Sequence, residues 1–75
     1  MPPRKRRVPY RAVADALRER LDEGEWLPGE AMPSLSALAA QYGVSRATAA
    51  RAVKVLEGEG RVESEQGWGT FVAES

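Results

Sequence analysis

Apolar residues recur at spacings of three and four in three stretches of this chain, which predicts three helices that each bury one side. The first helix is predicted over residues 10–23, the second over residues 34–41 and the third over residues 45–57. The three apolar stripes are Tyr10, Val13, Ala14, Leu17 and Leu21, then Leu35, Leu38, Ala39 and Tyr42, then Ala49, Ala52, Val53 and Leu56.

Capping residues mark the ends of these predicted helices. Ser34 and Ser45 stand where a side-chain oxygen can accept hydrogen bonds from the free N–H groups of a first turn. Gly24 and Gly43 stand just after the first and second helices, where glycine takes the left-handed conformation at little cost. The boundaries of the helices can therefore be predicted as well as their buried sides.

A turn separates the first helix from the second. The Pro-Gly pair at residues 28–29 predicts type II geometry, since Pro suits the second turn position and Gly the third. We expect Trp26 and Leu27 to fill the core beneath this loop, and a contact with a ligand or partner is the weaker interpretation of Trp26. Residues 31–32 are predicted to form a very short strand.

The last part of the chain predicts a β-hairpin. Val62, Phe71 and Val72 have strand character, and residues 66–70 carry two glycines around one Trp, which is typical of a tight hairpin tip. The short connection through Gly43 is that of a helix-turn-helix, whose second member lies in the major groove of DNA. The order of elements therefore predicts a mainly α fold with a small β-hairpin, a winged helix-turn-helix of three helices plus a wing.

The predicted third helix has a basic side opposite its apolar stripe. No acidic residue occurs between residues 46 and 56, although acids are common elsewhere. Small alanines between the cations leave room for a bulky anionic surface, so this side fits the major groove. An ordinary solvated face with three cations is the alternative on this helix alone. The outward positions are Arg46, Ala47, Ala50, Arg51 and Lys54.

Composition restricts the chemistry that the chain can perform. The 75 residues allow one small domain, and they contain no Cys and no His. A disulfide framework and a thiolate metal site are thereby excluded, and the commonest metal ligand and general base is missing. Gly67 and Gly69 lack the third glycine and the following helix of a phosphate-binding loop. We therefore expect no enzyme activity, no metal and no cofactor.

Charge is unevenly distributed along the chain. Eleven cations balance eleven carboxylates, but residues 4–7 are all basic and the residues after them carry a net charge of −4. Residues 1–9 are therefore predicted to be a flexible basic arm before a domain over residues 10–75, and any nucleic-acid contact has to use local patches. The arm could lie along phosphates or enter the minor groove, or it could be a solubilising tail.

Hydropathy argues against a membrane or secreted protein. No apolar run approaches the length of a membrane span. The basic start is not followed by the apolar region of a secretory signal. We expect a soluble, intracellular, cytoplasmic protein that is associated with the nucleoid.

Three sequence segments stand out, both by their residues and by the distances between them along the chain. They are LPGEAMPS at residues 27–34, LAAQYGVSRATAARAVKVLEGEG at residues 38–60 and QGWGTFV at residues 66–72. A lone Gly-Val-Ser is weak evidence, but the combination of turn, Pro-Ser cap, helix end and wing is specific. Together the segments closely resemble the N-terminal DNA-binding domain of the GntR family of bacterial transcription regulators. The resemblance covers residues 10–73, which is nearly the whole chain.

The resemblance implies a winged helix-turn-helix that binds a short palindromic operator in double-stranded DNA as a homodimer. Arg46 corresponds to an arginine that reads a base, typically guanine, and Thr48 to a threonine that contacts backbone or base. Ser34 and Ser45 correspond to helix starts that hold phosphate oxygens through N–H groups, and residues 66–70 correspond to a wing at the minor groove. With the cations of the third helix and the arm, the predicted DNA-binding residues are Ser34, Ser36, Ser45, Arg46, Ala47, Thr48, Arg51, Lys54, Gln66, Gly67, Trp68, Arg4, Lys5, Arg6 and Arg7.

The chain departs from the family pattern at several positions. Leu35-Ser36 stands where family members commonly have Glu-Arg, so Ser36 makes a weaker DNA contact or none. Ala50 and Arg51 stand where the family often has Arg and Glu, which moves the basic group by about 100° round the helix. Trp68 replaces a residue that is often basic, and it packs either on sugars in the minor groove or on the protein itself.

Family members usually carry a C-terminal domain that binds a metabolite and holds the dimer together. This chain stops at Ser75, directly after the predicted wing, so we expect no small-molecule effector here. Two copies are then expected either to pair only on DNA or to pair through Trp26, Trp68 or the first helix. A separate protein partner is the third way to supply the second contact. The alternative function is a winged-helix protein-interaction module or an accessory subunit of a larger regulatory complex, because the domain is acidic outside its arm. The acid-free side of the third helix favours DNA.

Overall fold

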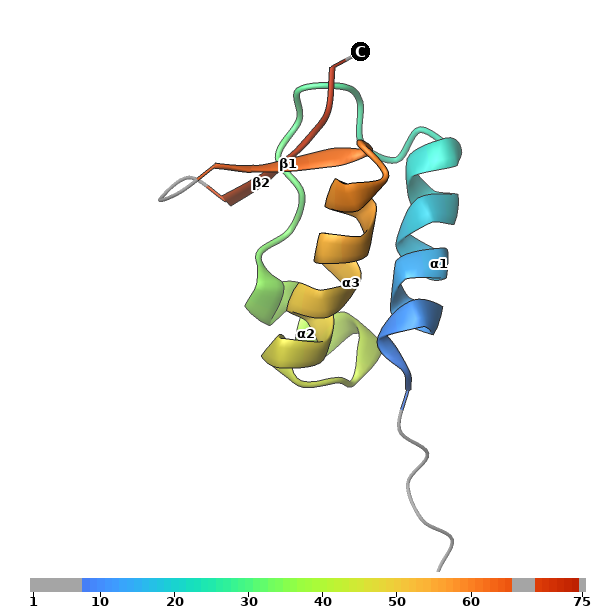
Figure 1. Cartoon of the computed structure of the whole chain (residues 1–75), viewed down its shortest axis with the longest axis vertical. Coiled ribbons are helices and arrows are strands. Elements are labelled where there is room, and N and C mark those ends of the chain that lie inside the picture. The colour runs from blue at the N-terminus through green and yellow to red at the C-terminus, as the bar shows by residue number, and fades with distance from the viewer. Residues whose placement is uncertain (1–7, 66–68, 75) are drawn as a thin grey trace, which may run out of the picture.

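The computed structural model describes residues 8–65 and 69–74, which form three helices followed by a two-stranded hairpin. Figure 1 shows α1 (Tyr10–Asp22), α2 (Leu35–Tyr42), α3 (Arg46–Gly58), β1 (Val62–Glu65) and β2 (Gly69–Val72) in that order. This arrangement confirms the predicted winged helix-turn-helix of three helices plus a hairpin.

The predicted helix caps are confirmed. The Oγ of Ser34 accepts a hydrogen bond from the N–H of Ala37 at 3.1 Å, so α2 begins just after Ser34. Gly43 ends α2 in the left-handed conformation, with φ of 65°, which a residue with a side chain adopts only at a cost. Gly24 likewise follows α1 with φ of 79°. These caps thus define where α2 begins and ends and where α1 ends.

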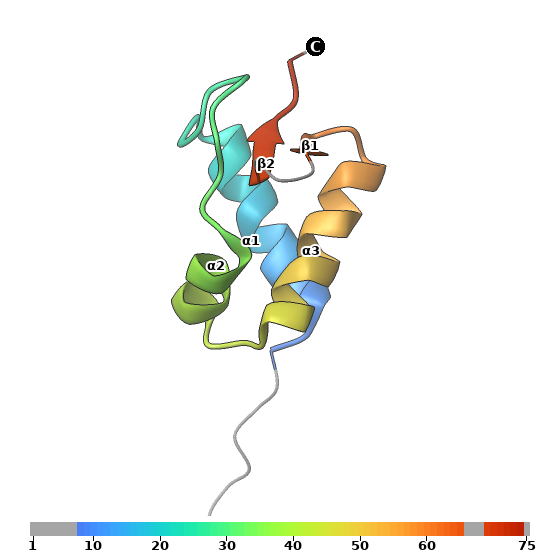
Figure 2. The ribbon, with the colours of Figure 1, turned by 90° about the vertical axis from the view of Figure 1, so that its left-hand side faces the viewer.

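The core lies between the three helices and is closed at one end by the hairpin. Leu17, Leu38 and Leu56, one from each helix, are almost completely buried. Figures 1 and 2 show α1 and α3 side by side and running in the same general direction, with α2 at the end away from the hairpin. Ala49 and Ala52 on the inner side of α3 are also fully buried, and their small side chains allow the helices to approach closely.

The hairpin is antiparallel, and backbone hydrogen bonds from β2 connect it to residues 29–32. Val62 pairs with Val72 and Glu65 with Gly69. Ala31 forms an isolated bridge with Phe71, as expected for a very short strand at residues 31–32. Gly69, which was predicted to lie in the hairpin tip with Thr70, is the first residue of β2. Both residues continue the ladder, since Thr70 pairs with Ser64 and Gly69 with Glu65, and the Met32 N–H also donates a hydrogen bond to the Thr70 carbonyl oxygen at 2.8 Å.

The prediction that Leu27 fills the core is wrong. Its side chain is 60% exposed, because the Glu30 N–H donates to the Leu27 carbonyl and the Leu27 N–H to a Glu30 carboxylate oxygen, which closes a turn on the surface. Gly29 has φ of 86° in this turn, as the predicted type II geometry requires. Trp26 packs against the core and is half-buried beneath Arg20, whose guanidinium carbon is 4.4 Å from the ring centroid.

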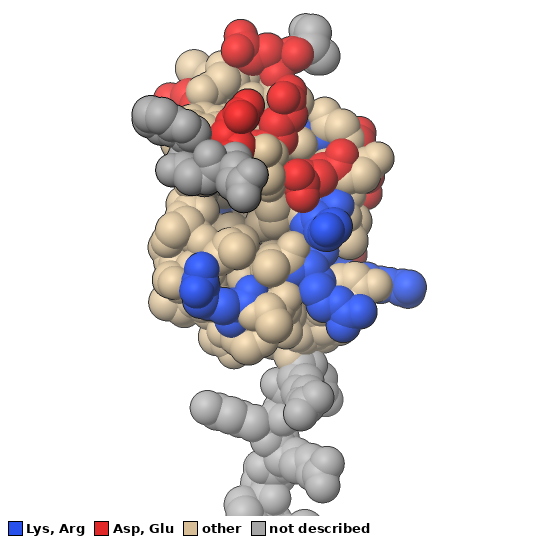
Figure 3. Space-filling view, turned by 60° about the vertical axis from the view of Figure 1, so that its left-hand side comes forward, with Lys and Arg blue, Asp and Glu red and all other residues tan. Residues whose placement is uncertain are grey.

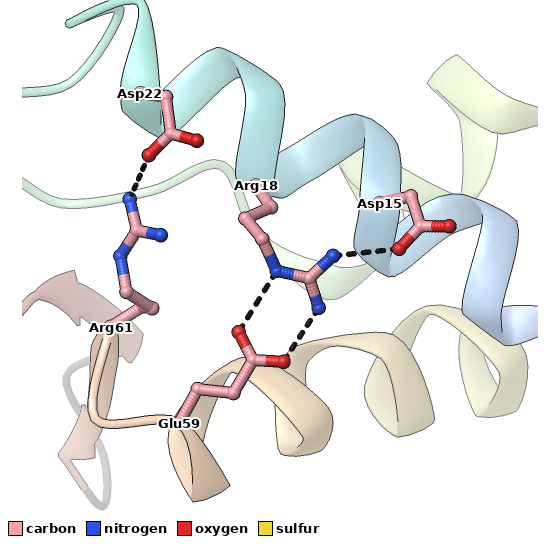
Figure 4. Close-up of polar contacts among 5 residues, drawn as sticks. All are labelled: Asp15, Arg18, Asp22, Glu59 and Arg61. Atoms are coloured by element: carbon pink, nitrogen blue, oxygen red, sulfur yellow. Dashed lines mark hydrogen bonds and ion pairs between the residues drawn. The ribbon is translucent and has the colours of Figure 1, made fainter.

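Ion pairs fasten α1 to the end of α3. Figure 4 shows Arg18 of α1 between Glu59 and Asp15; it donates from Nε and Nη2 to the two carboxylate oxygens of Glu59, at 2.9 and 2.6 Å. Arg61 pairs with Asp22 at 2.6 Å one turn further along α1. The hydrogen bonds from Arg18 hold the pKa of the Glu59 carboxyl below its usual range, and they raise the pKa of Arg18 further.

We expect Leu17→Ala to destabilise the domain severely. A buried Leu→Ala change costs about 2–5 kcal/mol, because the apolar contact is lost and a cavity remains. Domains of this length have roughly 4–11 kcal/mol in total, so the variant should melt far below the native chain. Thermal unfolding followed by circular dichroism measures this, with Leu27→Ala as the exposed control. Equal melting temperatures for the two variants would contradict the buried position of Leu17.

Glu59→Gln should lower stability at neutral pH and flatten the acid limb of the stability curve. Since the pKa of Glu59 is lower in the folded chain, its contribution is complete above the unfolded value of about 4.3 and is lost as the pH falls through the folded value. Urea unfolding between pH 2 and 7 measures the effect. Glu19→Gln, at an exposed position of α1, is the control and should leave the curve nearly unchanged.

Candidate nucleic-acid interface

The outer side of α3 is basic and accessible, as predicted. Arg46, Ala47, Arg51 and Lys54 are exposed, while Ala50 is half-buried. The opposite side carries the buried residues of the helix, so the two sides are separated by the 3.6-residue period. The core therefore fixes which side of α3 a ligand can reach.

The first turn of α3 is organised by two hydroxyls. The Ser45 Oγ accepts a hydrogen bond from the Thr48 N–H at 3.0 Å and donates one to the Thr48 Oγ1 at 3.1 Å. No acidic residue lies in this turn, and Arg46 is its first helical residue. A cation at this end opposes the helix dipole, so the turn contains an unfavourable charge that a bound anion or a base edge would compensate.

The described cations fall into two groups. Arg18, Arg20 and Arg61 each form an ion pair with a carboxylate. The other four described cations form no ion pair with any described residue. Three of them belong to α3 and one to α1: Arg46, Arg51 and Lys54, and Arg11. The charge that remains for a ligand is thus concentrated on α3 and the start of α1.

Carboxylates gather at the other end of the molecule. Figure 3 shows cations on the half of this face away from the hairpin and acidic side chains on the half near it. Glu63, Glu65 and Glu74 line a hollow of about 430 Å³ together with Phe71. An anionic ligand is therefore attracted to the helical end and repelled from the hairpin strands.

Sequence reasoning missed two residues next to α3. Tyr10 was assigned only to the apolar stripe of α1, but its ring faces Arg51, whose guanidinium carbon is 5.0 Å from the ring centroid. Arg11 was taken as a surface charge of α1, and its guanidinium carbon lies 5.9 Å from the same centroid. The signal in the sequence was weak, since only the packing of α1 on α3 brings these side chains next to the basic side of α3.

The other residues that were predicted to bind DNA lie outside α3. Ser34 caps α2 and Ser36 is exposed in its first turn. The predicted wing residues Gln66, Gly67 and Trp68 lie outside the described residues, and so do the arm residues Arg4, Lys5, Arg6 and Arg7. Their DNA contacts stay predictions.

Within residues 8–65 and 69–74, no group of three or more acidic side chains is arranged to hold a metal ion. No helix in this part of the chain is long and apolar enough to cross a membrane. Among the described residues, the basic side of α3 is therefore the candidate site.

Three helices, a glycine turn before the basic third helix and a terminal hairpin define a winged helix-turn-helix of the DNA-binding class. Comparison with known proteins identifies it further. The family model for bacterial regulatory proteins of the gntR family matches residues 9–72. The chain belongs to the GntR family.

Individual relatives agree with this assignment. The mannosyl-D-glycerate transport/metabolism system repressor MngR of Escherichia coli is 46% identical over 65 residues, which cover 87% of this chain and 27% of that protein. The histidine utilization repressor of Klebsiella aerogenes is 45% identical with the same coverage of both chains. This chain therefore spans about a quarter of the length of these relatives.

Among solved structures, the DNA-binding domain of AraR in complex with the operator ORX1 superposes with a TM-score of 0.84. The two sequences are 33% identical, and the match covers 97% of this chain and 90% of that one. The AraR domain bound to a second operator, ORE1, gives the same TM-score at 34% identity, with coverage of 97% and 93%. The fold of this chain is thus that of domains captured on operator DNA.

Proposed function

We propose that this chain is a sequence-specific DNA-binding domain of a transcription regulator and that α3 enters the major groove. The observation that carries the proposal is the sorting of charge: the cations without a described ion pair are on the outer side of α3 and beside it. Family membership and the likeness to AraR domains on operators support the same ligand. The proposal involves no enzyme chemistry and no cofactor.

In this proposal Arg46 reads a base. It is exposed in the first turn of α3, and Ala47 beside it allows the helix to approach the base edges closely. A guanidinium can donate two parallel hydrogen bonds to guanine O6 and N7, which discriminates against other bases by about 1–3 kcal/mol. Thr48, which follows Ala47, offers a methyl group and a hydroxyl for contacts with the DNA backbone or a base.

Phosphates would be held around this base contact by the starts of two helices. The first N–H groups of α2 and α3 follow Ser34 and Ser45, and such helix starts bind phosphate oxygens. Ser36 would contribute a weak contact or none, as its short side chain is exposed in the first turn of α2. Arg51 and Lys54 would supply positive charge further along α3.

The wing would lie at the minor groove through Gln66, Gly67 and Trp68. Glu65 precedes this segment directly, and Glu63 is two positions earlier on the same strand. Both are exposed, so nearby phosphates repel the base of the wing. The wing is therefore proposed to adjust the binding, while the helices provide most of the affinity.

Two copies of the domain are needed for useful specificity. One winged helix reads a half-site of a few base pairs, and paired half-sites about one helical turn apart are the usual arrangement. We propose that a homodimer on a palindromic operator, or a separate protein partner, supplies the second contact. Two relatives are named repressors, so control of transcription is the proposed role of the whole protein.

A protein-interaction module is the second candidate. The observation in its favour is the hollow at the hairpin, where Phe71 lies among Glu63, Glu65 and Glu74. A basic and apolar segment of another protein would fit this chemistry. This use is compatible with DNA binding, because the hollow is away from the basic side of α3 (Figure 3).

Selection of bound sequences from a random duplex pool tests the main proposal. The native chain should enrich a paired motif, and Arg46→Ala should lose one base preference in each half, with a discrimination loss of about 1–3 kcal/mol. Arg46→Lys keeps the charge without the planar fork and should also lose that preference. Lys54→Ala is the control, since it should weaken binding with an unchanged motif. Enrichment of no motif at moderate salt would exclude specific binding by this chain alone.

Removal of residues 2–7 should flatten the salt dependence of binding without changing the motif. Each neutralised phosphate contributes about −0.9 to the slope of log K against log salt. If all four arm cations contact phosphates, the slope should become shallower by up to about 3.6. Titrations between low and moderate salt measure it, and an unchanged slope would show that the arm is only a tail.

A further inference from the structure

The start of α1 and the middle of α3 form a hollow that is separate from the base-reading turn. It has a volume of about 240 Å³ and is lined by Tyr10, Arg51, Lys54 and Val55. Arg51 lies over the Tyr10 ring, and Arg11 approaches the same ring from the neighbouring position of α1. Three cations from two helices thus converge beside one aromatic side chain.

This convergence is unfavourable without a counter-charge. Neighbouring like charges repel, and none of the three cations forms an ion pair with a described carboxylate. The negative face of the Tyr10 ring attracts cations within about 6 Å and so offsets part of the repulsion. The remaining positive charge favours an anion in the hollow.

The position along α3 indicates which anion it is. Arg51 and Lys54 follow Arg46 by five and eight residues, which corresponds to about 7.5 and 12 Å along the helix axis. The major groove is about 12 Å wide. If Arg46 contacts a base edge, these later residues reach the sugar–phosphate backbone that borders the groove. The start of α1 then lies against the same backbone.

We propose that this hollow is a subsite for one phosphodiester of the DNA duplex, in which Arg11, Arg51 and Lys54 supply the charge and Tyr10 positions Arg51. Guanidinium groups suit phosphate oxygens because their N–H donors form a planar fork. Stacking on Tyr10 restricts the long side chain of Arg51 before DNA arrives, so less freedom is lost on binding. The inference rests on the proposed DNA binding and adds α1 to its interface.

A matched pair of variants at Tyr10 isolates the role of the ring. Tyr10→Phe keeps the ring and should bind the selected duplex like the native chain. Tyr10→Leu keeps an apolar side chain against the core but removes the ring face, and should weaken binding about two- to fivefold. The enriched motif should be the same for both variants. Thermal unfolding of each variant checks that the fold is retained.

Coupling to Arg51 separates positioning from a structural role. Arg51→Ala should weaken binding and reduce the salt slope by about 0.9, because one phosphate contact is lost. In that background, Tyr10→Leu should have no further effect. An equal loss from Tyr10→Leu in both backgrounds would overturn the positioning role, since the ring would then act only through the fold.

The phosphate itself can be located with duplexes that carry a single neutral methylphosphonate. At one backbone position in each half-site, the neutral group should weaken binding of the native chain and of Tyr10→Phe strongly, and binding of Arg51→Ala clearly less, because only Arg11 and Lys54 then remain at the subsite. Equal sensitivity of the native chain and Arg51→Ala at every position would overturn the subsite. A native chain that selects a motif while Tyr10→Leu and Tyr10→Phe bind alike leaves the proposed function standing and removes only this inference. Failure of the native chain to bind any duplex would overturn both.

Discussion

The packing of α1 against α3 is the contact on which the rest of the structure depends. Leu17 and Leu56 are buried at its centre, and Ala52 allows the two helices to approach closely. The ion pair between Arg18 and Glu59 and the stacking of Tyr10 on Arg51 both join residues 41 positions apart, so one parallel register holds from the start of α1 to the end of α3. That register buries one side of α3 and leaves the opposite, basic side exposed.

The same register decides which cations remain available. Arg11 and Asp15 have the i,i+4 spacing of an intrahelical ion pair, but a cation placed before the acid is the weaker order. Asp15 instead pairs with Arg18, which Glu59 also holds. Arg11 is thereby left beside Tyr10 and adds to the charge near α3. Structural ion pairs at one end of the helices thus produce the basic surface at the other.

The fold could be predicted from the sequence because local chemistry and periodicity agree. The caps at Ser34 and Ser45, the left-handed Gly43 and the buried side of α3 follow from short-range rules, and all are confirmed. Leu27 was predicted wrongly because hydrophobicity alone does not tell on which side of a turn a residue lies. The contact of Tyr10 with Arg51 could not be predicted, since the ring fits the apolar stripe of α1 equally well with or without a cation on its face.

The distribution of carboxylates gives the two halves of the proposed interface opposite responses to salt. Contacts from α3 are attractive, so added salt weakens them. Glu65 next to the wing is repelled by phosphates within a Debye length of about 8 Å at physiological ionic strength, and added salt relieves that repulsion. As the salt concentration rises, the wing therefore contributes a larger fraction of the binding free energy and α3 a smaller one. In the proposed complex the helical end therefore supplies the attraction to the duplex, although residues 8–75 carry a net negative charge, and the carboxylates near the hairpin oppose it only where the wing approaches the DNA.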